Sequence, residues 1–217
     1  MAVARPAPAH PFLDWPGPIA FAHRGGASDN PENTMPAFQH AIDLGYTYIE
    51  TDVHATSDGV LVAFHDPDLS RTCGRPGTIN ALPWSEVAGA RVDGREPIPL
   101  FEDLLASFPH ARVNIDCKAD SALPGLIASL RRLDCLDRVC VGSFSDRRLH
   151  QLRRELGPRL LTSFGPAQIT TLRLGGRVVG GGTVAQVPVG LSQIKEVPRR
   201  VQPFQVATER LVRSAHR

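Results

Sequence analysis

Short apolar segments alternate with amphipathic segments along most of this 217-residue chain, and this alternation constrains its fold more than any other feature. Apolar runs bounded by turn residues predict strands at 19–22, 48–53, 61–64, 113–117, 139–142, 159–162 and 184–189. Amphipathic spacing predicts helices at 101–108, 123–133, 146–156, 167–174 and 209–215. Repeated strand-helix units indicate a parallel sheet, either closed as a barrel or open and doubly wound.

The remaining segments divide the chain around this repeat. Asn30 and Pro31 have the pattern of a helix N-cap followed by proline, and the apolar residues after them, Phe38, Ala41, Ile42 and Leu44, follow helical spacing. The stretch 66–99, which follows the predicted strand 61–64, is rich in proline and glycine and is expected to be an inserted surface excursion. We expect one domain over 18–217, preceded by an N-terminal extension at 1–17.

Composition excludes several classes of protein. A hydrophobic content of 42% supports one substantial core, and no apolar run is long enough to span a membrane. The first 18 residues lack a continuous hydrophobic centre, so they do not have the pattern of a signal peptide and a cytoplasmic location is expected. The four cysteines show no Cys-x-x-Cys pairing, which favours reduced thiols over disulfides or zinc. A net charge of +2 argues against a nucleic-acid partner, and the sequence does not indicate an oligomeric state.

Polar residues with a spacing of two distinguish between the two sheet architectures. Glu50 and Asp52 leave the same face of one predicted strand, and Asn114, Asp116 and Lys118 repeat that geometry on a later one. Polar groups on one face near the carboxyl ends of several strands are typical of a (β/α)₈ barrel. An open sheet would place its ligand groups in loops at a switch point instead.

The segment from His23 to Gly26 follows the first predicted strand and combines an acid/base group, a fixed cation and two glycines. If a helix begins soon afterwards, this loop directs backbone donors and a positive dipole end toward an anion. The alternative is an ordinary strand-to-helix turn. That alternative explains the glycines well and explains the pairing of His23 with Arg24 poorly.

The carboxylates Glu50, Asp52 and Asp116 would repel one another unless a cation neutralises them. Oxygen ligands without cysteine favour Mg²⁺ or Ca²⁺ over Zn²⁺. The alternative is a buried ion network in which Arg24 and Lys118 balance the charge. Two histidines favour the metal, because His65 ends the strand 61–64 much as His23 ends the first. Such a pair suits a displacement at phosphorus.

Together these motifs resemble the glycerophosphodiester phosphodiesterases. The matching elements are His23-Arg24-Gly25, Pro31-Glu32-Asn33-Thr34, Glu50-x-Asp52, Asp58-Gly59 and His65-Asp66. The resemblance extends over about residues 18–217 and is densest up to Lys118. It implies a TIM (β/α)₈-type barrel of the phospholipase C-like phosphodiesterase kind, with a small insertion after the second strand.

The resemblance also implies an activity in lipid and glycerol metabolism, the metal-dependent hydrolysis of a small-molecule glycerophosphodiester to glycerol 3-phosphate and an alcohol. Carried over by position, the metal ligands for Mg²⁺ or Ca²⁺ are Glu50, Asp52 and Asp116. The general acid/base pair is His23 and His65. The phosphate-binding residues are Arg24 and Lys118.

Two departures from the family pattern accompany the resemblance. Asp116 stands where the family usually has glutamate, so the third ligand is one methylene shorter. The Trp-Thr-x-Asn-like and Gly-x-Asp-Gly elements of the last two barrel strands do not occur, which predicts a barrel incomplete at its C-terminal end. Two alternatives to the phosphodiesterase remain: a lysophospholipase D, and a truncated, non-catalytic phosphodiester-binding protein.

Overall fold

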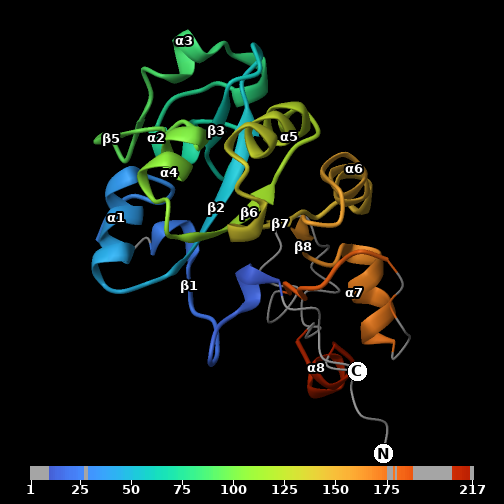
Figure 1. Cartoon of the computed structure of the whole chain (residues 1–217). Coiled ribbons are helices and arrows are strands. Elements are labelled where there is room, and N and C mark those ends of the chain that lie inside the picture. The colour runs from blue at the N-terminus through green and yellow to red at the C-terminus, as the bar shows by residue number, and fades with distance from the viewer. Residues whose placement is uncertain (1–9, 27–28, 175–177, 179, 188–206, 216–217) are drawn as a thin grey trace, which may run out of the picture.

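A computed structural model describes residues 10–26, 29–174, 178, 180–187 and 207–215 (Figure 1). Its main sheet contains five parallel strands, β1 (Phe21–Ala22), β2 (Tyr48–Ala55), β6 (Arg112–Cys117), β7 (Val139–Gly142) and β8 (Leu161–Thr162). A parallel bridge from Ser163 to Val184 extends the sheet by one position. The predicted parallel sheet is confirmed. The predicted strand 184–189 is reduced to this bridge at Val184, and 188–189 lie outside the described residues.

The order of the strands identifies the architecture. The order β1-β2-β6-β7-β8 follows the sequence without reversal, which is typical of a barrel and not of a doubly wound sheet, whose order reverses at a switch point. In the part of the chain that the structure describes, no pairing joins β1 to the bridge at Val184. The sheet is therefore a barrel that does not close within these residues, as expected from the absent family elements.

A third segment shares one edge of β2 with β1. The short strand β3 (Leu61–Ala63) runs antiparallel to β2, with Ala63 opposite Val53, whereas β1 runs parallel to β2 and ends with Ala22 opposite Ile49. Because β6 occupies the other edge of β2, the carboxyl ends of β1 and β3 point toward each other. His23 and His65, which follow those ends, are thereby brought to the same level of the sheet.

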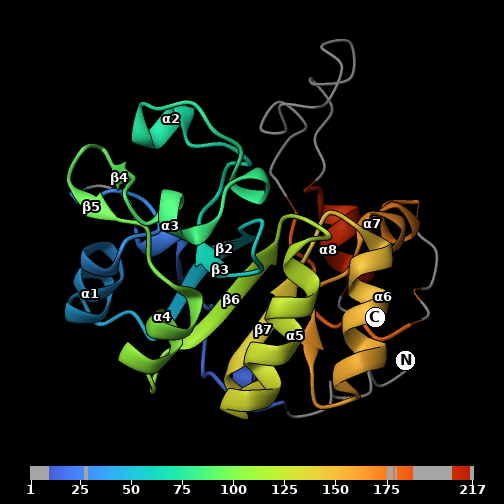
Figure 2. The same ribbon diagram turned by 90° about the horizontal axis from the view of Figure 1, so that it is seen from above.

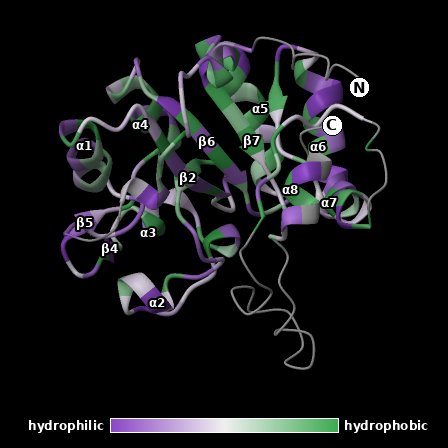
Figure 3. Ribbon diagram, turned by 90° about the horizontal axis from the view of Figure 1, so that it is seen from below, coloured by the Kyte–Doolittle hydropathy of each residue, from purple (hydrophilic) through white to green (hydrophobic). Residues whose placement is uncertain are grey.

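Helices follow the strands in turn: α1 (Met35–Asp43), α4 (Phe101–Ser107), α5 (Ala122–Leu133), α6 (Asp146–Leu156), α7 (Pro166–Arg173) and α8 (Glu209–Ala215). Seen from above, α5 and α6 lie alongside β6 and β7 (Figure 2). The core between them contains Ile49, Val113, Ile115 and Leu126, all fully buried. Strands β6 and β7 are mostly apolar, whereas α6 presents a polar outer face (Figure 3). No helix among the described residues combines the length and apolarity needed to cross a bilayer.

The start of α1 corrects the prediction of an N-cap at Asn30. The helix begins at Met35 and is capped by Thr34, whose hydroxyl accepts a hydrogen bond from the Ala37 amide at 3.4 Å. Asn33 cannot belong to the helix because its φ is +54°. Its side chain is also committed elsewhere, to two residues of β2.

Part of the predicted N-terminal extension packs into the sheet. Pro11–Leu13 form a single turn of 3₁₀ helix, and Phe12 is 1% exposed. The Phe12 ring meets the Tyr48 ring edge-on at 5.3 Å, and the Tyr48 hydroxyl donates to the Phe12 carbonyl. Phe12 forms a cluster with Cys140 and Leu161 on the inner face of the sheet. This segment therefore fills the amino-terminal end of the barrel interior.

The inserted segment 66–99 has its own small core. It contains α2 (Ser70–Cys73), the 3₁₀ turn Ile79–Ala81, α3 (Trp84–Val87), β4 (Arg91–Val92) and β5 (Glu96–Pro97). Leu69, Ile79 and Val87 are fully buried and pack with Val62 and Phe64 of the β3 region. These elements gather on the side of the sheet near α1, away from α6 to α8 (Figure 2).

Candidate active site

Two adjacent strands place the predicted carboxylates and Lys118 together. The β2–β6 register sets Glu50 opposite Asn114 and Asp52 opposite Asp116. Lys118 follows β6, and its Nζ lies 2.9 Å from Asp52 Oδ1 and 2.8 Å from Asp116 Oδ2. Burial acts to lower the pKa of Lys118, but Asp116 and Asp52 raise it above its usual value. A fixed ammonium group therefore bridges two carboxylates at the carboxyl edge of the sheet.

The loop after β1 brings Arg24 against the same carboxylates. Its backbone N–H donates to Glu50 Oε2 at 3.0 Å. The anion that this backbone donor binds is therefore a carboxylate of the protein. The Arg24 guanidinium donates to Glu32 at 3.0 Å, and its Nε lies 3.5 Å from Asp52 Oδ2. Gly25 is required beside it, because its φ is +81° and a Cβ would lie 2.8 Å from the Ala37 Cβ. The glycine thus permits close packing of this loop on α1.

The two predicted histidines have different surroundings. The His23 side chain is 69% exposed, and its Nε2 lies 3.8 Å from Glu50 Oε2. Burial lowers the pKa of His23, and the neighbouring Arg24 lowers it further. The His65 side chain is 26% exposed, and its Nδ1 lies 2.6 Å from Asp66 Oδ1. Because an ionised carboxylate only accepts, His65 Nδ1 is the donor and Nε2 is left without the proton in the neutral ring.

Burial shapes the charges of Glu50 and Asp52. Burial raises the pKa of Glu50 to about 8, with further contributions from Asp52 and Asp116. Burial also acts to raise the pKa of Asp52, but Lys118 and the Asn33 amide hold it below its usual value. Two buried polar atoms of the described residues have no hydrogen-bond partner, Arg24 Nε and Asp116 Oδ1. Glu50 therefore takes up a proton more readily than an exposed carboxyl does, and Asp116 has an uncommitted carboxylate oxygen.

Several supporting residues were not identified from the sequence. Asn33 is 1% exposed; its Nδ2 donates to Asp52 at 3.0 Å and its Oδ1 accepts from the Thr51 hydroxyl at 2.8 Å. His54, to which the sequence assigned no role, donates from Nε2 to the His65 carbonyl at 3.1 Å. Arg71 joins Asp66 to Glu32. The Pro-Glu-Asn-Thr and His-Asp motifs contained the signal for Glu32, Asn33 and Asp66, whereas Arg71 lies in a turn-rich stretch without one.

Among the described residues, no three Asp, Glu, His or Cys side chains are already gathered in the arrangement of a metal site. Lys118 Nζ lies between Asp52 and Asp116, where it keeps these two groups engaged. The residue types nevertheless suit a hard cation, because all three predicted ligands offer oxygen. The uncommitted Asp116 Oδ1 and the raised pKa of Glu50 are both features that a bound cation would relieve.

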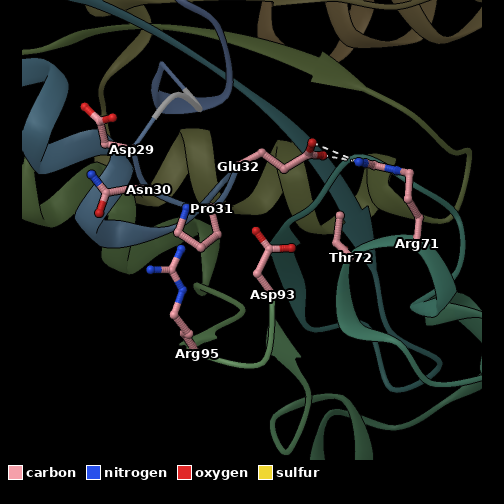
Figure 4. Close-up of a pocket in the computed structure, with 8 residues that line it drawn as sticks. All are labelled: Asp29, Asn30, Pro31, Glu32, Arg71, Thr72, Asp93 and Arg95. Atoms are coloured by element: carbon pink, nitrogen blue, oxygen red, sulfur yellow. Dashed lines mark hydrogen bonds and ion pairs between the residues drawn. The ribbon is translucent and has the colours of Figure 1, made fainter.

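A polar pocket of about 260 Å³ lies between the loop before α1 and the inserted segment (Figure 4). It is lined by Asp29, Asn30, Pro31, Glu32, Arg71, Thr72, Asp93 and Arg95. None of the predicted site residues lines this pocket. Glu32 and Arg71 line the pocket and are hydrogen-bonded to each other (Figure 4). Glu32 also accepts from the predicted site residue Arg24, and Arg71 donates to Asp66, the partner of His65.

Comparison with known proteins gives a consistent set of relatives. Residues 23–217 match the Glycerophosphoryl diester phosphodiesterase family. A probable glycerophosphodiester phosphodiesterase 2 of Mycobacterium tuberculosis is 40% identical over 212 residues, which are 93% of this chain and 80% of that protein. The human lysophospholipase D GDPD1 is 35% identical over 113 residues, or 46% of this chain and 36% of that protein.

A crystal structure of a glycerophosphodiester phosphodiesterase from Agrobacterium tumefaciens str. C58 superposes with a TM-score of 0.62 at 28% identity. The matched region covers 66% of this chain and 65% of that one. The chain therefore spans slightly less than two thirds of the solved structure that it matches, and the strands described above correspond to part of a full barrel.

Proposed function

The chain belongs to the glycerophosphoryl diester phosphodiesterase family, and from this premise we propose that it hydrolyses a glycerophosphodiester to glycerol 3-phosphate and an alcohol. One observation supports the proposal above the others. The facing ends of β1 and β3 bring His23 and His65 beside the carboxylates of β2 and β6. Acid/base groups, anionic ligands and cations therefore meet at one edge of the sheet, as phosphodiester hydrolysis requires.

We assign proton transfer to His23 and His65. One removes a proton from the attacking water, and the other protonates the oxygen of the departing alcohol. A pKa of His23 below its usual value favours the neutral ring, which is the form that accepts a proton. Asp66 holds His65 with Nδ1 as donor, which leaves Nε2 for the proton that is transferred.

We assign phosphate binding to Arg24 and Lys118. Each is already oriented by carboxylates, Arg24 by Glu32 and Asp52, and Lys118 by Asp52 and Asp116. Oriented cations bind a phosphoryl group with little further loss of side-chain freedom.

We assign a divalent cation, Mg²⁺ or Ca²⁺, to Glu50, Asp52 and Asp116. The donor set is oxygen only, Asp116 Oδ1 is uncommitted, and burial together with the neighbouring Asp52 and Asp116 raises the pKa of Glu50, which a bound cation would oppose. When bound, the ion supplies positive charge to the phosphoryl oxygens. The protein residues retain the other tasks: His23 and His65 move protons, and Arg24 and Lys118 orient the diester.

Glycerophosphocholine turnover tests the proposal. His23→Ala and His65→Ala are each expected to lower kcat/KM by about 10²- to 10⁴-fold, the usual contribution of general acid/base catalysis. His150→Ala is the matched control, because His150 is exposed on α6, outside the site. Equal rates for wild type and both site variants would contradict the assignment.

A lysophospholipase D activity is the second candidate. It is favoured by the similarity to human GDPD1 and by Phe144, which follows β7 at the carboxyl edge of the sheet and is 65% exposed. An apolar side chain there could contact an acyl chain. Comparing kcat/KM for lysophosphatidylcholine and glycerophosphocholine separates the two candidate activities. Phe144→Ser is expected to lower kcat/KM for lysophosphatidylcholine and to leave that for glycerophosphocholine unchanged.

The thiols support a cytoplasmic location as a further part of the proposal. All four cysteines are free, and Cys117, Cys135 and Cys140 are buried. Disulfide-free cysteines are usual in reducing compartments. Fractionation of cells that produce the chain, with an oxidising-compartment marker as the reference, tests this assignment.

A further inference from the structure

Charged side chains of alternating sign form a continuous chain of contacts around the site. From one end the order is His65, Asp66, Arg71, Glu32, Arg24, Asp52, Lys118 and Asp116. Seven of these eight positions belong to the motifs already described. Arg71 does not, yet it is the member that connects the His65 end of the chain to the Arg24 end.

Arg71 uses both edges of its guanidinium group. Its Nε donates to Asp66 Oδ2, while Nη1 and Nη2 donate to the two oxygens of Glu32 at 2.9 and 2.5 Å. Two parallel N–H···O bonds to one carboxylate fix the relative orientation of the two groups. A lysine at position 71 would supply the charge without this fork.

Each carboxylate that Arg71 holds is also bound to a proposed catalytic or phosphate-binding residue. Asp66 Oδ1 accepts a hydrogen bond from His65 Nδ1, and Glu32 Oε1 accepts one from Arg24 Nη1 in addition to the one from Arg71. Burial acts to raise the pKa of Asp66, but the hydrogen bonds from Arg71 and His65 hold it at about 2. Burial likewise opposes ionisation of Glu32, whose pKa is nevertheless lowered by Arg71 and Arg24. Both carboxylates therefore remain acceptors.

We propose that Arg71 and Glu32 are positioning residues, which act through Asp66 and Arg24 to orient the imidazole of His65 and the guanidinium of Arg24. The proposal rests on the proposed function for the roles of His65 and Arg24. Arg71 belongs to α2 of the inserted segment, and Glu32 to the loop before α1. The insertion therefore contributes directly to the geometry of the site, although none of its residues from 67 onward was predicted to do so.

The first test does not depend on activity. Imidazole nitrogen NMR of the full chain, with the His65 signals assigned by their loss in His65→Gln, reports which nitrogen of His65 carries the proton. Wild type is expected to show His65 with its proton on Nδ1. Arg71→Gln is expected to give a mixture of tautomers, because Asp66 is no longer held in place. Arg71→Lys is expected to resemble Arg71→Gln, since a lysine cannot hold both carboxylates.

The second test separates positioning from stability. With glycerophosphocholine as substrate, Arg71→Gln is expected to lower kcat about tenfold or more, and to change KM much less, because proton transfer depends on the orientation of His65. Glu32→Gln combined with Arg71→Gln is expected to cost little more than the larger single effect, since the two residues act as a unit. Arg132→Gln, which removes an arginine–glutamate pair between α4 and α5, is the matched control and is expected to leave kcat unchanged.

Each outcome is decisive. A single Nδ1-protonated tautomer in Arg71→Gln, or recovery of wild-type kcat in Arg71→Lys, would overturn the proposal. A loss of kcat that is fully explained by a fall in the melting temperature of the variant would also overturn the proposal. If wild type turns over no diester, the proposed function fails by itself, and the NMR measurement still decides whether Arg71 orients His65.

Discussion

Replacing Lys118 by methionine tests whether charge balance at this site stabilises the fold. The change keeps most of the apolar stem and removes the ammonium group that bridges Asp52 and Asp116. The side chains of Lys118, Asp52 and Asp116 are 19%, 2% and 14% exposed, so the two carboxylates would lose their partner in a largely buried place. Removing one member of such a buried pair costs about 3–5 kcal/mol of unfolding free energy.

The matched control is Arg132→Met, which removes an ion pair whose side chains are 64% and 34% exposed and should cost at most about 1 kcal/mol. Urea unfolding at neutral pH, in the presence of a chelator, measures both variants. The pKa of Asp52 is lowered in the folded state. The contribution of Lys118 is therefore present above the unfolded value of 3.8 and is lost as the pH falls through the folded value. Equal losses for the two variants would show that the Lys118 bridge stabilises the fold no more than an exposed ion pair does.

Three other perturbations have defined outcomes. Gly25→Ala should cost about 1–3 kcal/mol more than Gly59→Ala in urea unfolding, because both residues have positive φ but only Gly25 lacks space for a Cβ. Phe12→Ala should cost about 3–5 kcal/mol by the same assay, because Phe12 is 1% exposed inside the sheet; a loss below that of the exposed Trp15→Ala would contradict the packing. The pKa of Asp66 is held at about 2, below the unfolded value of 3.8, so its contribution to stability should be full above pH 4 and lost toward pH 2. In Asp66→Asn this part of the acid dependence should disappear, and an unchanged acid dependence would contradict it.

The local sequence pattern was sufficient to predict the bounds of an element where one face of that element is buried. The strand predicted at 139–142 and the helix predicted at 146–156 have these same bounds in the structure, and the helix predicted at 123–133 begins one residue earlier, at Ala122. In each, apolar residues with a regular period pack on the core between sheet and helices. The spacing of Glu50 and Asp52 likewise identified two side chains on one face of β2.

Long-range contacts explain what the sequence did not show. Asn30 has the pattern of a helix cap, but the helix begins later, because the Asn33 side-chain amide is hydrogen-bonded to Asp52 and Thr51 of β2. Phe12 lies in a proline-rich stretch whose pattern gives no sign of burial, and it is buried by contact with Tyr48. Arg71 binds Glu32 across 39 positions of the sequence. No local pattern records such partners.

We propose that the site around His23, Glu50, Asp52, His65 and Asp116 hydrolyses a phosphodiester with a bound divalent cation. The most direct measurement is the release of glycerol 3-phosphate from glycerophosphocholine by the purified chain, before chelation, after it, and after adding back Mg²⁺ or Ca²⁺. We expect release that chelation abolishes and one of the two ions restores, with no restoration in Glu50→Gln. Release that continues unchanged after chelation, or no release with either ion, would contradict it.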